Sequence, residues 1–416
     1  MRILIISQYF WPESFVINQL SRTLVLQGHQ IVVLTGKPNY PNGDVYPGYA
    51  IKGNQCEWMG NVEVIRVPLR PRKSNNGIDL FFNYISFIWS GLLRFPFLVK
   101  NREFDVIFVF APSPITSAIP AILLKYLKRI HLAVWVQDLW PESLAATGFI
   151  KNKIILKMVS YLIRWIYSCS DTLLVQSEAF IKQLSDLTNL DKVIYFPNAI
   201  GDMQKQCKQN KYPQLPEHLT TVLENNFCLV FAGNIGKAQS VETLIFSAQL
   251  LNSYPNIRIV LVGKGSMLEW AKQEVVRLHL SNVTFAGSFP QEVMPLIFAK
   301  AKGLLVSLKA DEIFSYTIPS KIQAYFSAGQ PVIASIDGEA ARIIKDAGAG
   351  LTCAAEDPKG LANLMIQLFK MEQIERDMLG SNGRKYFLEN FEIEQQCLRL
   401  VDILESRIAD KGVDVK

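Results

Sequence analysis

Short apolar runs alternate with amphipathic segments along both halves of the chain. Runs such as residues 132–136 and 257–262 are apolar at nearly every position. Such runs are typical of strands buried on both faces of a parallel sheet, with helices as the crossovers between them. The pattern predicts an α/β fold of two Rossmann-like, doubly wound domains that face each other across a cleft. Strands are expected near residues 2–6, 30–35, 62–67, 105–110, 131–136, 172–176 and 192–196 in the first half, and near 227–232, 257–262, 283–286, 303–307 and 331–335 in the second.

The length of the chain also indicates two domains, because 416 residues exceed what one hydrophobic core usually supports. Hydrophobic residues make up 49% of the chain and charged residues 19%, so each half can bury a core. We place the first domain at residues 1–200 and the second at residues 227–391. Residues 201–226 lack periodicity and predict a linker, whereas residues 392–410 predict a helix that crosses back to the first domain.

Two segments of the first half, residues 78–99 and 153–167, predict helices that are apolar except for one narrow polar stripe. A basic stripe beside aromatic residues suits a helix at an anionic membrane surface. A helix that is apolar nearly all round is, alternatively, often simply core. Neither segment is continuous enough to span a bilayer. The stripes consist of Asp79, Asn83, Ser86, Ser90 and Arg94 in the first segment and of Lys153, Lys157, Ser160 and Arg164, beside Tyr161, Trp165 and Tyr167, in the second.

The positive charge of the chain belongs to its first half. The formal net charge is +6, and residues 1–200 contain 20 Lys and Arg against 13 Asp and Glu, while the rest contains 23 against 24. This asymmetry indicates that the first domain faces something anionic, such as a membrane surface, a pyrophosphate-linked acceptor or nucleic acid. A solvated basic surface is the alternative.

The six cysteines are scattered without CxxC pairs, and the four histidines show no metal-ligand spacing. This argues against a zinc site or a disulfide framework and indicates a reducing compartment. Residues 1–7 are apolar at first but lack a signal-peptide cleavage pattern, so we interpret them as a buried strand. We therefore predict a cytoplasmic protein that holds no metal or other cofactor.

Three loops of the second half follow predicted strands, where ligands bind in doubly wound domains. Their glycines allow the backbone to approach a ligand, and a helix that starts at Ser320 beside Lys321 favours a phosphate. We predict a diphosphate seat here, with Ser240 as the N-cap of a nearby helix. Each loop alone would equally fit a tight turn. The loop residues are Gly233, Asn234, Gly236 and Lys237, then Gly263, Lys264 and Gly265, and finally Thr317, Pro319, Ser320 and Lys321.

In the first half, the loop at residues 137–143 follows a buried strand and contains Asp138 and Trp140. A carboxylate held at a strand end can orient a hydroxyl or accept a proton, although it can also cap a helix or brace a loop. The loop after the first strand is aromatic where a dinucleotide-binding fold would have GxGxxG, which argues against a dehydrogenase. The chain also lacks a Walker A pattern, which weakens a kinase interpretation, and a DxD pair that could hold a metal. The candidate residues of this loop are Tyr9, Trp11, Glu13 and Asn18.

Taken together, these residues resemble the family 4 glycosyltransferases, retaining enzymes of the GT-B fold that use nucleotide sugars. The resemblance covers essentially the whole chain and points to the bacterial surface-polysaccharide branch. The first part of the chain, through residues 37–41, resembles O-antigen or capsule enzymes that transfer L-fucosamine. The resemblance rests on residues 27–35, 137–143, 196–199, 231–237, 261–265 and 319–334.

The chain departs from the family pattern on the donor side. Asn234 stands where the family usually has arginine, and Gln239 where it has lysine. Ala324 stands at the second glutamate of the E-x7-E motif, which holds the ribose, and Tyr316 lies near the first. We expect other side chains to act in their place, namely Lys237 and Lys321 for the cations and Asp311 or Glu312 for the carboxylate.

The resemblance implies that the second domain binds a UDP-linked sugar and the first a lipid-diphosphate-linked acceptor sugar. The product would serve O-antigen or capsule biosynthesis at the inner face of the cytoplasmic membrane, with N-acetyl-L-fucosamine as one candidate sugar and nucleic acid excluded as a partner. Two alternatives stay open: a GT-B epimerase acting on the donor alone, and a noncatalytic binding module. The catalytic candidates are Asp138, Lys321 and Lys237, and the acceptor candidates are Tyr9, Trp11, Glu13, Asn18, Asp138 and Trp140.

Overall fold

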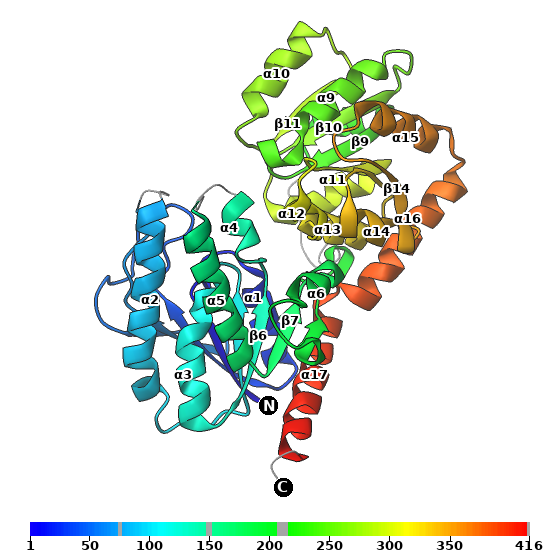
Figure 1. Cartoon of the computed structure of the whole chain (residues 1–416). Coiled ribbons are helices and arrows are strands. Elements are labelled where there is room, and N and C mark those ends of the chain that lie inside the picture. The colour runs from blue at the N-terminus through cyan, green and yellow to red at the C-terminus, as the bar shows by residue number, and fades with distance from the viewer. Residues whose placement is uncertain (74–76, 147–151, 206–214, 414–416) are drawn as a thin grey trace. The chain divides into compact units, whose positions relative to one another are not determined.

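The computed structural model describes residues 1–416 except 74–76, 147–151, 206–214 and 414–416. The chain forms two compact units (Figure 1): unit 1 contains residues 1–199 and 393–416, and unit 2 contains residues 200–392. Each unit is built on a largely parallel sheet flanked by helices, so the predicted α/β class of two doubly wound domains is confirmed.

Unit 1 contains an eight-stranded sheet of order β3-β4-β2-β1-β5-β6-β7-β8, in which only β3 is antiparallel to its neighbour. The seven predicted strands are confirmed. β3 was missed because its side chains alternate between half-buried and exposed, as in an edge strand, and form no apolar run. The strands are β1 (Arg2–Ser7), β2 (Gln30–Gly36), β3 (Gln55–Met59), β4 (Val62–Val67), β5 (Val106–Ala111), β6 (His131–Val136), β7 (Thr172–Val175) and β8 (Val193–Tyr195).

Helices cover the sheet of unit 1, and the last helix of the chain is one of them. α17 packs on α1 and buries Cys397, Leu400 and Leu404 in the same core as Ile3 and Ile5. α2, α3 and α5 pack side by side (Figure 1). The helices are α1 (Val16–Leu26), α2 (Gly77–Leu98), α3 (Ile119–Lys128), α4 (Glu142–Ala146), α5 (Lys153–Cys169), α6 (Glu178–Leu184) and α17 (Ile393–Val413), with short 3-10 helices η1 (Ile115–Ala118) and η2 (Leu190–Lys192).

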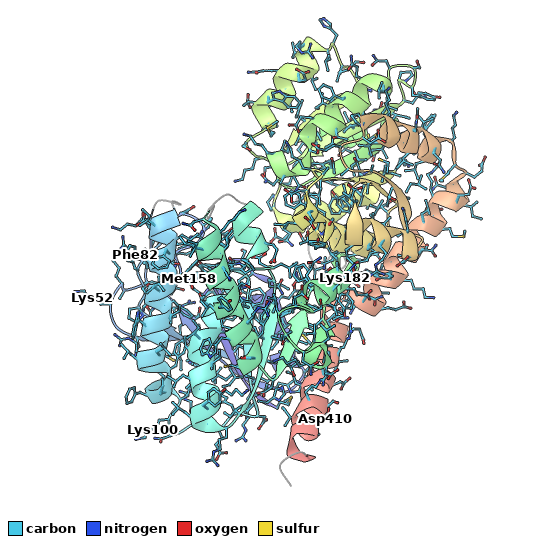
Figure 2. All side chains as sticks on the ribbon, in the orientation of Figure 1. Lys52, Phe82, Lys100, Met158, Lys182 and Asp410 are labelled. Carbon is cyan, nitrogen blue, oxygen red and sulfur yellow. The ribbon has the colours of Figure 1, made fainter. Side chains whose placement is uncertain are left out.

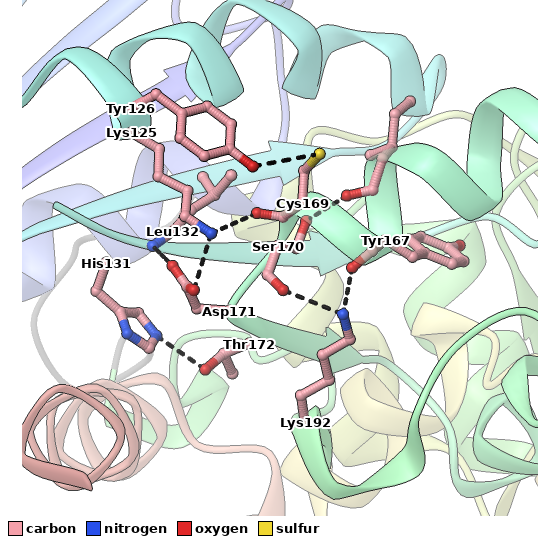
Figure 3. A network of polar contacts seen from close by, with 11 residues as sticks. Lys125, Tyr126, His131, Leu132, Tyr167, Cys169, Ser170, Asp171, Thr172 and Lys192 are labelled. Carbon is pink, nitrogen blue, oxygen red and sulfur yellow. Dashed lines mark hydrogen bonds and ion pairs between the residues drawn. The ribbon is translucent and has the colours of Figure 1, made fainter. Parts of the chain in front are cut away.

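Two lysines hold the C-terminus of α5 (Figure 3). The Lys125 ammonium donates to the Cys169 carbonyl at 2.6 Å and pairs with Asp171 at 2.8 Å. The Lys192 ammonium donates to the carbonyls of Tyr167 at 2.5 Å and Ser170 at 3.2 Å. Cations at a helix C-terminus satisfy its free carbonyls and complement its dipole. The network lies where β7 begins, at the edge of the sheet opposite the candidate loops, and it fixes α5 without using any candidate residue.

Unit 2 contains a six-stranded parallel sheet of order β11-β10-β9-β12-β13-β14. The five predicted strands are confirmed, and β14, a half-buried edge strand of four residues, was missed. The strand order reverses beside β9, where doubly wound sheets bind ligands. The strands are β9 (Phe227–Ala232), β10 (Ile257–Val262), β11 (Val283–Gly287), β12 (Gly303–Ser307), β13 (Val332–Ser335) and β14 (Gly350–Cys353).

Part of the segment predicted as a linker is helical. α8 (Glu217–Asn225) buries Leu219 and Leu223 in the core of unit 2, and Asp202 forms an ion pair with Arg384 at 2.5 Å. These residues therefore belong to unit 2, and the mainly polar composition concealed a helix that packs only Leu219, Val222 and Leu223 against the core. Residues 206–214 of the same segment lie outside the described residues.

The remaining helices of unit 2 flank its sheet. They are α9 (Val241–Leu250), α10 (Leu268–Arg277), α11 (Met294–Lys300), α12 (Glu312–Ser315), α13 (Ser320–Ala328), α14 (Gly338–Asp346), α15 (Pro358–Lys370) and α16 (Gln373–Asn390), with η3 (Lys237–Gln239) and η4 (Gln291–Val293). In the part of the chain that the structure describes, no helix has both the length and the apolar character required to cross a membrane.

Candidate functional site

The loops after β9 and β10 meet at the carboxyl edge of the unit 2 sheet because glycines leave room between them. A Cβ on Gly263 would lie 1.9 Å from the Gly233 carbonyl oxygen, and one on Gly265 would lie 2.3 Å from the Ile235 oxygen. The Gly233 N–H donates to Val262 and the Ile235 N–H to Lys264, both at 2.9 Å. The predicted glycines therefore let these two loops pack against each other, which fixes the backbone that borders the predicted donor site.

Lys321 leaves the first turn of α13 and reaches the loop after β9. Its ammonium donates to Gln239 Oε1 at 2.6 Å and lies 3.5 Å from the centroid of the Phe231 ring. Gly233 makes room for it, because a Cβ there would lie 2.9 Å from Lys321 Cε. Burial lowers the pKa of Lys321 to about 7, since the half-buried ammonium has lost water. Lys321 Nζ thus lies beside Gln239, the position at which the family pattern has a lysine.

The start of α13 lies at the same edge. The helix begins at Ser320 after Pro319 and has no side-chain cap. The Ala232 N–H donates to the Tyr325 hydroxyl at 3.0 Å, which ties the helix to the end of β9. Free N–H groups at a helix start favour an anion, and a nearby lysine adds to that preference. The geometry therefore suits a diphosphate next to Lys321.

The other predicted donor residues lie on neighbouring loops. Lys237, Lys264 and Asn234 are exposed. Glu312 accepts a hydrogen bond from the Tyr316 hydroxyl, so the tyrosine at the family's first glutamate position holds a carboxylate from the adjacent turn.

Three residues near the donor loops have local roles. Asp311 caps α12 by accepting from the Ile313 N–H at 3.0 Å, and Thr317 Oγ1 donates to the Phe314 carbonyl at 3.2 Å. Ser240 stands at the N-cap position of α9 but makes no cap bond, because its φ is +41° and its hydroxyl bonds the Thr243 hydroxyl at 2.8 Å. Ser240 is therefore the N-cap residue of α9, as predicted, but its side chain does not supply the cap bond.

Asp138 lies in the loop after β6, at the carboxyl edge of the unit 1 sheet. Its carboxylate is half-buried, and burial raises its pKa to about 6. It lies within electrostatic range of the Tyr84 hydroxyl on α2, a residue that the sequence analysis missed. A half-buried carboxylate that titrates near neutral pH can orient a hydroxyl and accept its proton.

Glu13 and Asn18 brace the aromatic loop after β1, and the burial of Glu13 corrects its assignment to the acceptor, while Asn18 is half-buried. Glu13 is only 2% exposed, and its carboxylate accepts from the N–H groups of Phe10, Asn39 and Tyr40 at 3.1, 2.8 and 2.7 Å. Asn18 accepts from the Trp11 N–H at 2.9 Å and donates to the Glu13 carbonyl at 2.6 Å. An acceptor cannot reach a carboxylate that is buried in this way.

The aromatic candidates differ in exposure. Tyr9 and Trp140 are buried, whereas Trp11 is half-buried. Tyr9 stacks on Phe15 with ring centroids 5.6 Å apart and packs against Tyr40 at 5.7 Å. Of the three, Trp11 is the most exposed and offers the most surface to a ligand.

Large apolar side chains cover the outer surface of α2, α3 and α5, which we call the apolar face. Their exposed fractions run from 44% for Phe82 to 78% for Phe97, and Figure 2 labels Phe82 and Met158 on this surface. The interpretation of these helices as simply core is therefore wrong. The face comprises Ile78, Phe81, Phe82, Trp89, Leu93 and Phe97 of α2, Tyr126 and Leu127 of α3, and Ile154, Ile155, Met158, Tyr161 and Trp165 of α5.

The polar stripe of α2 lies on the side of the helix that faces the protein interior, opposite the apolar face. Asn83 is buried, donates to the Arg70 carbonyl at 2.6 Å and accepts from Gln8 Nε2 at 2.6 Å. The stripe of α5 is different, because Lys153, Lys157 and Arg164 are exposed among the apolar residues. Apolar and cationic side chains thus share one surface.

Two family models match the chain, one on each unit. The model for a glycosyl transferase 4-like domain matches residues 14–199, and the model for glycosyl transferases group 1 matches residues 220–386. The chain therefore belongs to the family 4 glycosyltransferases and is a transferase.

Relatives and solved structures agree with this family. WbjE of Pseudomonas aeruginosa, named a probable glycosyltransferase, is 25% identical over 74% of this chain and 78% of its own. O-antigen chain mannosyltransferase C of Escherichia coli is 21% identical over 99% of this chain and 100% of its own. Sucrose-phosphate synthase of Thermosynechococcus elongatus (TM-score 0.71, 16% identity, 99% and 100% coverage) and Anabaena HepE with UDP (TM-score 0.67, 14%, 98% and 100%) share its GT-B fold.

Proposed function

We propose that this enzyme transfers a sugar from a UDP-linked donor to a lipid-diphosphate-linked sugar, with retention, during surface-polysaccharide biosynthesis. The observation that carries the donor half is the meeting of Lys321, the start of α13 and the glycine loops at one edge of unit 2. The mannosyltransferase of O-antigen chains and HepE, which binds UDP, support the substrate classes. N-acetyl-L-fucosamine is the first sugar to test.

The two units divide the chemistry between them. In unit 2, Lys321 and the N–H groups of α13 stabilise the charge that grows on the nucleoside diphosphate as its bond to the anomeric carbon breaks, which is usually the largest electrostatic contribution. In unit 1, Asp138 orients the acceptor hydroxyl, whose oxygen forms the new bond, and takes its proton. A pKa near 6 leaves Asp138 ionised at neutral pH and able to accept that proton.

The direct test begins with the nucleotide. Melting temperatures are measured with UDP, GDP, ADP and dTDP, because a ligand that binds only the folded state raises the melting temperature. A shift with UDP supports the proposed donor class, and a shift with another nucleotide alone refutes UDP as the carrier. If no nucleotide shifts the melting temperature, the proposed donor site is wrong.

Transfer is then assayed with UDP-sugars and a polyprenyl-diphosphate sugar, and the anomeric configuration of the product is read by NMR. Asp138→Asn should lower turnover by about 100-fold, the scale of losing one preorganised group. An inverted product would refute retention. The glycosyltransferase family and relatives do not favour the epimerase, which would change the donor without any acceptor.

The apolar face supports a membrane as the place of transfer. Monomeric proteins rarely leave so many large apolar side chains on one surface, and exposed lysine and arginine among aromatic rings suit anionic headgroups. We propose that this face docks on the inner leaflet of the cytoplasmic membrane, where a lipid-linked acceptor would lie.

Vesicle sedimentation tests this docking. The protein should bind phosphatidylglycerol vesicles more tightly than phosphatidylcholine vesicles, and salt should weaken the difference. Phe97→Ser should reduce binding, whereas Ile374→Ser, which changes a residue of similar exposure (77% against 78%) on α16 of unit 2, should not. Equal binding of both variants would show that the apolar face does not dock.

A further inference from the structure

Arg72 lies at the carboxyl edge of the unit 1 sheet, just after β4. Its backbone N–H donates to Asn39 Oδ1 at 3.2 Å, and its guanidinium carbon lies 5.0 Å from the centroid of Tyr40 and 5.8 Å from that of Tyr9. Its Nε is buried and has no hydrogen-bond partner in the described part of the chain. Aromatic contacts use the faces of a guanidinium, so its terminal Nη groups stay available in the plane for a ligand.

Three other arginines of unit 1 are, by contrast, paired with carboxylates. Arg66 forms an ion pair with Glu57, Arg102 binds both oxygens of Glu63 at 2.6 and 2.8 Å, and Arg70 pairs with Asp79 at 3.0 Å. Arg72 has no such carboxylate among the described residues. A half-buried guanidinium with neither ion pair nor side-chain hydrogen bond is costly to leave unmatched, which is a reason to look for an anion.

Arg72 and Asp138 both follow parallel strands at the carboxyl edge of the unit 1 sheet. Burial raises the pKa of Tyr84, the charge of Arg72 lowers it, and the charge of Asp138 raises it again. Both charges are thus within electrostatic range of the Tyr84 hydroxyl. Arg72 follows β4, Asp138 follows β6 and Tyr84 belongs to α2, so three separate elements bring these side chains together.

We infer that Arg72 and Tyr84 form a phosphate-binding subsite beside Asp138 that holds the phosphoryl group attached to the acceptor sugar. This assignment rests on the proposed transferase function, in which the acceptor hydroxyl lies at Asp138. It makes a phosphate-linked sugar, and not a free sugar, the substrate of unit 1. A guanidinium matches phosphate oxygens with two parallel N–H bonds, and the tyrosine hydroxyl can donate a third.

The subsite is tested by binding to the full chain with its nucleotide site saturated by UDP. The probes are farnesyl diphosphate and inorganic pyrophosphate. Arg72→Gln should weaken the binding of both by about tenfold or more, the scale of a lost charge-assisted hydrogen bond. Arg72→Lys, which keeps the charge but not the fork, should bind with intermediate affinity. Arg70→Gln, two residues away, is the matched control and should bind like the wild type.

The affinity for UDP shows that unit 2 of each variant is intact, and a melting temperature and urea transition like those of the wild type show that unit 1, which contains Arg72, is folded as well. If Arg72→Gln binds UDP and farnesyl diphosphate as the wild type does, the subsite is refuted while the donor site stands. If UDP does not bind the wild type, the proposed donor fails, and pyrophosphate binding to the Arg72 variants still decides the subsite. Equal affinity for the two probes would mean that phosphate alone is recognised; tighter binding of farnesyl diphosphate would mean that the lipid contributes. Either result supports the subsite only if Arg72→Gln weakens the binding of both probes.

Discussion

At the scale of single residues, Lys321 should make nucleotide binding depend on pH. Its pKa is about 7 in the folded protein against 10.5 for an ordinary lysine, so the free enzyme loses the charge as pH rises through 7. A bound diphosphate favours the charged form, and therefore affinity for UDP should fall by roughly tenfold or more between pH 7 and pH 9. Titration calorimetry measures this. In Lys321→Arg, which stays charged, the affinity should be nearly flat across this range.

The same shift has a consequence for stability, with the opposite sign of what a paired lysine would show. Between pH 7 and 10.5 the unfolded chain binds a proton at Lys321 that the folded chain does not, so this residue makes the protein more stable as pH rises through that window. The outcome that would contradict the binding prediction concerns affinity and not stability. If the affinity of the wild type for UDP does not change between pH 7 and pH 9, or equals that of Lys321→Arg over this range, Lys321 does not contact the diphosphate.

Gly233 should be required for nucleotide binding beyond its effect on folding. Its φ of +129° would strain any residue with a side chain, and a Cβ added there would lie 2.9 Å from Lys321 Cε. Gly287 has φ +82° but an added Cβ there meets nothing within 4 Å. Gly233→Ala and Gly287→Ala should each lose about 1–2 kcal/mol of stability in urea denaturation. Only Gly233→Ala should weaken UDP binding. If both variants lose the same affinity for UDP, Gly233 has no special role in the site.

The sequence indicates where a donor candidate lies more directly than where an acceptor candidate lies, for a physical reason. Lys321 follows Pro319 and Ser320, so its position at a helix start is a local property of the chain. The role of Glu13 depends on the N–H groups of Asn39 and Tyr40, which are distant in sequence, and no local pattern contains them. Arg72 and Tyr84 were missed because they come into electrostatic range of each other and of Asp138 only when the loop after β4, the helix α2 and the loop after β6 are brought together by folding.

At the scale of elements, α2 should separate into an inner face that stabilises the fold and an outer face that does not. Asn83→Leu leaves the Gln8 amide and the Arg70 carbonyl without their partner, which should cost about 2 kcal/mol or more in urea denaturation. Phe97→Ser, at a position 78% exposed, should change stability by less than about 0.5 kcal/mol. The reverse order would mean that the apolar side chains, and not the polar stripe, hold this helix in place.

The elements themselves followed from the apolar pattern wherever a strand is buried on both faces. β9 and β6 are continuous apolar runs and were predicted, whereas β3 and β14 are half-exposed edge strands whose side chains give no such signal. Periodicity also predicted the narrow polar stripe of α2. It did not predict whether the stripe faces the protein interior or the solvent, because a helix with one polar and one apolar side can pack against the protein with either side. The hydrogen bonds of Asn83 settle which side is inside.

At the scale of the whole molecule, the division into two units should be visible in hydrogen exchange. Residues 200–392 form one compact unit that contains the donor loops, while residues 1–199 and 393–416 form the other. Binding of UDP should therefore slow exchange most in peptides that cover residues 233–240, 263–266 and 317–321 of unit 2, because a bound ligand suppresses local opening where it makes contact. The matched internal control is α17, which directly follows unit 2 in sequence but packs in unit 1 and should change least. If UDP instead protects the unit 1 loops around Tyr9 and Asp138 most strongly, the nucleotide binds unit 1. The assignment of the donor to unit 2 and of the acceptor to unit 1 would then be reversed.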